Sequence, residues 1–330
     1  MNDHFQLNVA TVTPAWCNHP FVPATLFRIL EILHCEELMQ NQLAESEPPT
    51  ISRRPRDDEI DVYGLTHPGK LRTENQDHFL VGSLRGRLNV RLSSLPDDHR
   101  LPLEEERIAS FMMVADGVGG GQKGEAASRL ALEEVAQYIA DSARCYFRAD
   151  GGEGDFVQAL EEAAKRSHQA LRERGEVDAD SAGMATTLTL WIGVWPWIYL
   201  LQVGDSRYYC YSNGVLSQIS HDQTVAQALV DQGLLTKSLS EHSPLANVLA
   251  SSIGGPQTAP VVSRIPSSWE NVHLLCSDGL TKHISDKRIA ERLGTMRSAR
   301  QVCEDLLQDA LDGGGTDNIT IIVGRAVPRE

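Results

Sequence analysis

The spacing of apolar residues predicts several amphipathic helices. In 124–141 the apolar residues recur every fourth position and therefore share one helical face: Ala127, Ala131, Val135 and Ile139. A second helix is expected from Asp155, a residue type favoured as an N-cap, to Gly175, a residue type favoured as a C-cap. Further helical patterns cover 223–234, 285–293 and 300–311, and Gly313 ends the last of them.

Between the helical segments, the pattern changes to short runs of β-branched and aromatic residues. The stretch TTLTLWIGVWPWIYLLQVGDSRYYCYSNGVLSQIS predicts three or four successive strands, with an Asn-Gly hairpin turn within YSNGVL. Another buried strand is expected at 319–323. Adjacent strands with helices clustered between them predict an α+β fold whose sheet is largely antiparallel.

The N-terminal region differs from the rest of the chain. Residues 24–44 have a helical apolar pattern, and the following stretch ESEPPTISRRPRDDE is rich in proline and charge, as linkers are. We therefore predict a helix plus linker over 1–58 and a main domain over 59–330. Two interpretations of the helix stay open: it packs on the main domain, or it serves as a docking or regulatory arm.

Charge and cysteine content narrow the function classes. Asp and Glu number 45 against 30 Lys and Arg, giving a net charge of −15, which disfavours binding to nucleic acid or to anionic membranes. The six cysteines include no Cys-x-x-Cys pair, so buried thiols in a reducing compartment are expected. The apolar stretch 26–33 is interrupted by Arg28 and Glu31, which argues against membrane insertion. We expect a cytoplasmic protein.

Aspartate recurs where apolar runs begin or end. The residues concerned are Asp77, Asp116, Asp205, Asp278 and Asp317. A single aspartate at such a position is explained by its preference for turns. Several carboxylates gathered at one edge of packed sheets would repel one another unless a cation neutralised their charge. Oxygen-only ligands select hard ions such as Mg²⁺ or Mn²⁺, and a glycine such as Gly117 allows a backbone carbonyl to approach the ion. Two such ions can share a water molecule and direct it at phosphorus.

A basic residue accompanies this acidic set. Arg72 lies five residues before Asp77 in HPGKLRTENQD. A guanidinium group can bind two phosphate oxygens at once. Although loop arginines are usually just solvated, its position beside the acidic set favours a role in binding phosphate.

Seven motifs in order resemble the bacterial form of the protein phosphatase 2C family of metal-dependent phosphatases. They are THPGKLRTENQD, VADGVGGGQKGEAAS, GMATTLTL, VGDSRYY, ISHDQT, LLCSDGL and GGGTDNIT, which run from about residue 60 to 325. The resemblance implies two packed antiparallel sheets flanked by helices, an α-β-β-α sandwich, with a site for two Mn²⁺ or Mg²⁺ ions at one end. It also implies hydrolysis of phosphoserine and phosphothreonine by a metal-activated water, without a phosphoenzyme.

The resemblance also implies a role for each residue of the site. Asp116 would bridge both ions and the Gly117 carbonyl would bind one of them. Asp278 and Asp317 would ligate the other ion, and Asp77 would hold a metal-bound water without contacting an ion itself. Asp205, with Asp278, would bind a weaker third ion. Arg72 would bind the substrate phosphate.

The sequence departs from the family pattern at several positions. Val118 replaces a histidine found in animal members, so the leaving group would take its proton from water or from another acid. Gln76 stands where many relatives have glutamate, which removes one outer carboxylate. The segment 221–252 corresponds to a mobile flap, and 84–106 is expected to be an enlarged loop between the first two strands.

These observations favour a phosphatase that acts on a phosphorylated protein and opposes a bacterial serine/threonine kinase. Two alternatives remain: a phosphatase of small metabolites with the same metal site, and an inactive relative that serves as a binding module. The second alternative is disfavoured because Asp116, Asp205, Asp278, Asp317 and Arg72 are all present.

Overall fold

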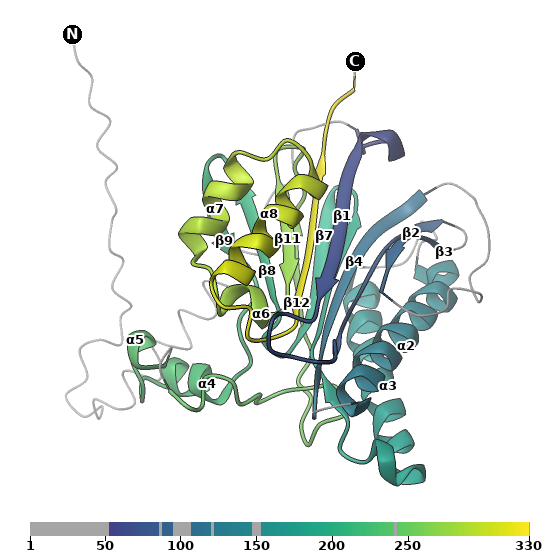
Figure 1. Cartoon of the computed structure of the whole chain (residues 1–330). Helices are drawn as coiled ribbons and strands as arrows, with labels where there is room; N and C mark the ends of the chain where they lie inside the picture. Colours follow the sequence, from purple (N-terminus) through teal and green to yellow (C-terminus); the bar gives the residue numbers. More distant parts are fainter. Residues whose placement is uncertain are drawn as a thin grey trace, which may run out of the picture. The chain divides into compact units, whose positions relative to one another are not determined.

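A computed structural model describes residues 53–85, 88–94, 107–119, 122–146, 153–240 and 243–329. These residues all belong to one compact unit, Pro48–Glu330. The helix expected at 24–44 lies outside the described residues. Two antiparallel sheets face each other and each is covered on its outer side by helices, which confirms the α-β-β-α sandwich (Figure 1).

In the first sheet, the last strand of the chain lies between the first strand and the central one. Its strands in spatial order are β1 (Ile60–His67), β12 (Ile319–Ala326), β11 (Val272–Cys276), β8 (Arg207–Ser212) and β9 (Val215–Gln218). Strands β8 and β9 form the predicted hairpin, in which Asn213 and Gly214 both have positive φ angles, of 51° and 82°. Positive φ at both positions is what the type I′ turn requires, and Asn-Gly supplies it at little cost.

The second sheet is built mainly from the middle of the chain. Its strands in spatial order are β10 (Val261–Pro266), β7 (Trp197–Val203), β6 (Leu188–Val194), β4 (Arg107–Val118), β2 (Asp77–Arg85) and β3 (Leu88–Ser93), and the short β5 (Ala185–Thr186) pairs with the end of β4. The stretch after Thr186 therefore contains four successive strands, β6 to β9, where the sequence predicted three or four.

Three apolar layers hold the sandwich together. The layer between the sheets includes Phe79, Val114 and Leu200 from the second sheet and Leu275 and Ile322 from the first. Helices α2 (Gln122–Tyr146) and α3 (Glu153–Val177) cover the second sheet, and α7 (Asp286–Gly294) and α8 (Ala299–Asp312) cover the first. Burial of these apolar faces is the main driving force for this arrangement.

The remaining helices are short and lie near one end of the strands. They are α4 (Val225–Asp231), α5 (Lys237–Ser240) and α6 (Asp278–Thr281), together with a 3-10 turn at Ala179–Ser181. Another 3-10 turn, Asp57–Glu59, directly precedes β1 at the opposite end (Figure 1). Helices α4 and α5 lie in the segment that the family resemblance assigned to a flap (Figure 1). No described helix has the length and apolar character needed to cross a membrane.

Several boundaries differ from the sequence predictions. Helix α3 begins at Glu153 and ends at Val177, so Asp155 is not its N-cap and Gly175 is not its C-cap. A Cβ atom at position 175 would lie 3.2 Å from the Ser181 carbonyl oxygen, so Gly175 is explained by close packing instead. The predicted loop over 84–106 contains strand β3, which pairs with β2.

Candidate metal centre

Strand pairing in the second sheet brings the first two predicted carboxylates together. Asp77, the first residue of β2, is paired directly with Asp116 near the end of β4. The Asp77 side chain is 2% exposed, and its Oδ2 accepts a hydrogen bond of 2.8 Å from the Thr320 hydroxyl. The Asp116 backbone is fixed by Thr187, whose hydroxyl accepts a bond of 2.9 Å from the Asp116 N–H. Asp116 therefore lies within the strand and not in a turn after it.

Gly117 is required by the close approach of three backbone segments. Its N–H donates to the Gln76 carbonyl at 3.1 Å. A Cβ atom at position 117 would lie 2.1 Å from the Gly124 carbonyl oxygen, at the start of α2, and 2.8 Å from the Gln76 carbonyl oxygen. Any larger residue would push the end of β4 away from the helix.

The first sheet contributes the next two carboxylates through β11 and β12. Asp278 is the first residue of α6, directly after Ser277, which follows β11. Asp317 lies in the turn between α8 and β12, two residues before the strand begins, as predicted. The Ser277 hydroxyl accepts a bond of 2.9 Å from the Thr320 N–H, which ties the start of α6 to β12.

Asp205 reaches the same region from the loop after β7. Gly204, just before it, has φ of +104°, and a Cβ there would lie 2.7 Å from the Thr187 side chain. Glycine at 204 therefore permits the sharp bend that follows the strand. Asp205 is 9% exposed.

The buried carboxylates raise one another's pKa values. Burial raises the pKa of Asp116 well above its usual range, and the charges of all four other predicted carboxylates add to this effect. Burial, with the charge of Asp278, raises the pKa of Asp205 to about 7, and burial raises the pKa of Asp77 to about 7. The five aspartates thus form one electrostatic cluster, in which ionisation of Asp77, Asp116 and Asp205 is unfavourable.

Two basic side chains contact this cluster. The Lys282 Nζ lies 2.5 Å from Asp278 Oδ2 and 2.9 Å from Asp317 Oδ2. The Arg72 Nε lies 2.9 Å from Asp317 Oδ1, with its side chain 53% exposed. Although burial opposes it, these two cations hold the pKa of Asp317 below its usual value.

Two buried oxygens in the cluster have no partner. Asp77 Oδ1 and Asp278 Oδ1 make no hydrogen bond with any described residue. Buried carboxylate oxygens without a partner are unfavourable, and a hard divalent cation is a suitable ligand for them. In this conformation no three His, Cys, Asp or Glu side chains among the described residues are arranged to hold one ion. The donor chemistry therefore fits Mg²⁺ or Mn²⁺, and ligation requires some side-chain rearrangement.

The loop that carries Arg72 is held by Asn318. The Asn318 side-chain amide donates to the carbonyl oxygens of Pro68 at 3.0 Å and Glu74 at 2.9 Å, and its Oδ1 accepts from the Gln76 N–H at 2.9 Å. Asn318 is 5% exposed. This side chain fixes both ends of the loop that positions Arg72 beside Asp317.

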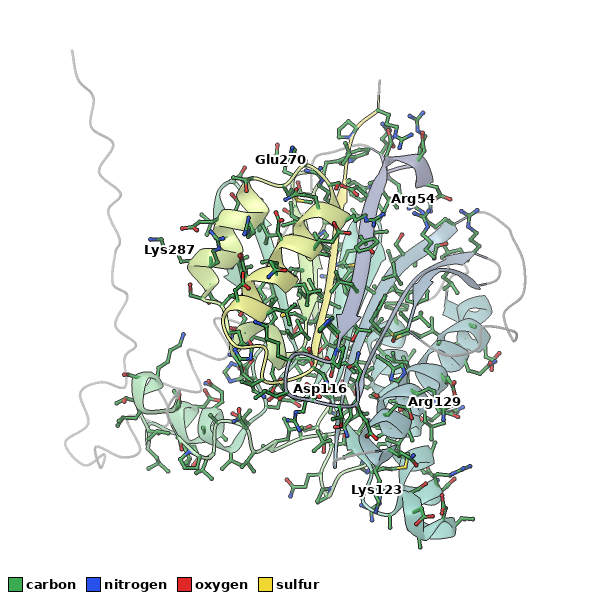
Figure 2. All side chains as sticks on the ribbon, in the orientation of Figure 1. Arg54, Asp116, Lys123, Arg129, Glu270 and Lys287 are labelled. Atoms are coloured by element: carbon green, nitrogen blue, oxygen red, sulfur yellow. The ribbon has the colours of Figure 1, made fainter. Side chains whose placement is uncertain are left out.

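Four aspartates of the cluster line an open groove of about 1100 Å³: Asp116, Asp205, Asp278 and Asp317. Arg72, Val118, Arg172 and Val248 are among its lining residues, and Val118 is 41% exposed. Figure 2 shows Asp116 at one end of the strands, whereas Arg54 and Glu270 lie at the opposite end. All the predicted site residues are thus brought to one end of the sandwich.

Sequence reasoning missed two polar residues that shape this site. Lys282 is four residues after Asp278, and that spacing in a helical turn was the available signal for a contact. Asn318 was visible beside Asp317, but its three partners come from a loop more than 240 positions earlier. The roles assigned to the individual site residues stay predictions.

Comparisons with known proteins agree with this architecture. Residues 85–312 match the family described as protein phosphatase 2C. The serine/threonine protein phosphatase PstP of Mycobacterium tuberculosis is 32% identical over 219 residues, and the serine/threonine phosphatase stp of Listeria monocytogenes is 29% identical over 214. The matched residues are 66% of this chain and 41% of PstP, and 64% of this chain and 83% of stp. This chain thus spans less than half the length of PstP.

A solved structure extends the match to the whole sandwich. The catalytic domain of PstP, crystallised in complex with two manganese ions, is 27% identical and superposes with a TM-score of 0.62. The superposition covers 82% of this chain and 99% of that one. The chain belongs to the protein phosphatase 2C family.

Proposed function

We propose that this chain is a metal-dependent protein serine/threonine phosphatase that hydrolyses phosphoserine and phosphothreonine. The observation that carries the proposal is the buried aspartate cluster, in which Asp77 Oδ1 and Asp278 Oδ1 have no partner among the described residues. A cluster of this kind is unfavourable in isolation and becomes useful once cations neutralise it. The manganese ions in the related PstP domain support the same metal chemistry.

The residues with the appropriate donors are those at the end of the sandwich. Asp116, the Gly117 carbonyl, Asp278 and Asp317 would hold two Mn²⁺ or Mg²⁺ ions, and Asp205 with Asp278 is the candidate site for a weaker third. When bound, such ions supply positive charge to a phosphate and lower the pKa of water.

The other residues act on the substrate and on water. Arg72, with a half-exposed side chain at the groove, would bind the phosphate oxygens, exchanging its contact with Asp317 for one with the substrate. Asp77 Oδ1 would accept a hydrogen bond from the attacking water and so orient it. The Val118 side chain has no acidic proton, so the leaving alkoxide oxygen would take its proton from solvent or from another acid.

The open groove favours a protein substrate over a small metabolite. A metabolite enzyme would enclose most of its ligand, whereas Arg72 and Val118 are exposed at the edge of this site. A phosphorylated side chain on a protein surface can reach such a site without a closing lid. The binding-module alternative has less support because all the acidic residues of the cluster are present.

The substrate class is tested by comparing a phosphothreonine peptide with glucose 6-phosphate at saturating Mn²⁺. We expect kcat/KM to be higher for the peptide by at least about tenfold, because the groove offers contacts beyond the phosphate. A reaction in excess EDTA is the control. A higher kcat/KM for the sugar phosphate would establish the metabolite alternative, and no turnover of either substrate would favour the binding module.

The partners and location form part of the same proposal. A phosphoprotein substrate implies a serine/threonine kinase that produces it. Cys210, Cys276 and Cys303 are free thiols, which supports a reducing, cytoplasmic location.

A further inference from the structure

Lys282 lies among carboxylates that the proposed function assigns to metal binding. Its Nζ contacts Asp278 Oδ2 at 2.5 Å and Asp317 Oδ2 at 2.9 Å, so one ammonium group joins the two acidic residues of the first sheet. The two carboxylates come from different segments, the start of α6 and the turn before β12. Lys282 therefore bridges them as a cation would.

Local structure holds Lys282 in this position. The Lys282 N–H donates to the Asp278 carbonyl oxygen at 2.8 Å, so the two residues are one helical turn apart and their side chains share a face. The next residue, His283, accepts a bond of 2.9 Å from the Thr316 N–H through its Nε2. The pair Lys282–His283 thus anchors the turn that carries Asp317. The Lys282 side chain is 29% exposed, which leaves it partly shielded from solvent.

Lys282 contacts one oxygen of each of the two carboxylates. At Asp278 it contacts Oδ2, while the buried Oδ1 has no hydrogen-bond partner among the described residues. At Asp317, Oδ2 contacts Lys282, while Oδ1 contacts Arg72 and accepts a hydrogen bond from the Asn318 N–H. Asp278 therefore has one oxygen without a donor from the described residues, whereas both oxygens of Asp317 already have donors.

We propose that Lys282 is a built-in counter-ion of the metal site, which keeps the metal-free cluster folded and competes with divalent ions for Asp278 and Asp317. This inference rests on the proposed function, because it assumes that the cluster binds Mn²⁺ or Mg²⁺. In this proposal Lys282, which is not itself a metal ligand, lowers the affinity of the site for Mn²⁺ or Mg²⁺. An ammonium group a few ångströms from a divalent ion repels it, whereas in the metal-free protein it offsets carboxylate repulsion.

The test is Lys282→Met, which keeps the length of the side chain and removes its charge. Thermal unfolding is measured in EDTA and across a Mn²⁺ titration, with Lys287→Met as the matched control. Lys287 is an exposed lysine of α7 that lies away from Asp116 (Figure 2). In EDTA we expect Lys282→Met to have a Tm several degrees below wild type, and in saturating Mn²⁺ a Tm close to it. The Mn²⁺ concentration for half-maximal stabilisation should fall by at least about tenfold.

A purely structural role gives a different result. If Lys282 only packs against its neighbours, Lys282→Met lowers the Tm equally with and without Mn²⁺ and leaves the half-maximal concentration unchanged, which overturns the inference. Lys282→Arg keeps the charge and should behave like wild type, so it provides the test if Lys282→Met does not fold in EDTA. An absence of any Mn²⁺-induced Tm change in wild type would instead contradict the proposed function itself.

Discussion

The five aspartates of the site differ in how much positive charge lies beside them. Asp278 and Asp317 contact Lys282, whereas burial dominates the environments of Asp77, Asp116 and Asp205 and raises their pKa values. In the metal-free protein, ionising these three at neutral pH therefore opposes folding. These buried carboxylates therefore lower the free energy of unfolding of the metal-free protein, and the same carboxylates provide oxygens that can bind cations.

Replacing Asp77 with asparagine tests this electrostatic penalty. The folded-state pKa of Asp77 is raised to about 7, against an unfolded value near 4, so in wild type its contribution to stability falls as pH rises from about 4 to about 7. In EDTA, the free energy of unfolding of Asp77→Asn relative to wild type should increase by roughly 1.4 kcal/mol per pH unit over that window. Urea unfolding at pH 5 and pH 8 measures the difference.

Asp180→Asn provides the control for this comparison. Asp180 is exposed and lies in the 3-10 turn at Ala179–Ser181, so its replacement should change stability by the same small amount at both pH values. If Asp77→Asn and wild type have parallel pH dependences, the carboxylate of Asp77 is not destabilised by burial.

At the level of elements, the site depends on loops held by one side chain. Asn318 makes three hydrogen bonds to the loop that precedes β2, and that loop carries Arg72. Position 69 in the same loop has φ of +81°, and a Cβ there would lie 2.2 Å from the Asp317 carbonyl oxygen. The Arg72 loop and the Asp317 turn therefore pack as one unit.

Removing the Asn318 side chain should displace Arg72, while all five carboxylates of the cluster remain in the chain. We expect Asn318→Ala to lose about 2–4 kcal/mol of stability, because three partly buried hydrogen bonds are lost, and to raise the KM for a phosphothreonine peptide. Arg72→Ala should raise that KM by about 10- to 100-fold, with a smaller change in kcat. Steady-state kinetics at saturating Mn²⁺ measures both parameters.

The double variant decides whether Asn318 acts through Arg72. If it does, Asn318→Ala should add little to the KM of Arg72→Ala. Independent, multiplying effects would mean that Asn318 influences substrate binding by another route.

Local sequence patterns predicted the elements better than their ends. The Asn213-Gly214 turn was predictable because that dipeptide specifies its own backbone geometry. The ends of α3 were not predictable. Aspartate is favoured both at an N-cap and in the first helical turn, so Asp155 did not fix where the helix begins, and Gly175 is explained by close packing against the 3-10 turn at Ala179–Ser181. Strand β3 was missed because its pairing with β2 is a tertiary feature.

At the scale of the whole molecule, the sandwich brings distant segments to one end. Asp77 and Asp116 come from the second sheet, and Asp278 and Asp317 follow or precede central strands of the first. The motifs and the family resemblance were enough to predict this gathering. The contacts of Lys282 and Asn318 were not predictable, because they depend on how α6 and the loop before β2 meet the turn at Asp317.

The most direct test of the account is the Mn²⁺ dependence of phosphothreonine-peptide hydrolysis by wild type and Asp278→Asn. Circular dichroism confirms that each protein is folded, and Asp180→Asn is the surface control. We expect turnover that requires Mn²⁺ in wild type and in the control, and a loss of at least about 100-fold in folded Asp278→Asn. Turnover in excess EDTA, or equal rates for wild type and Asp278→Asn, would contradict the proposal that this aspartate cluster is a catalytic metal site.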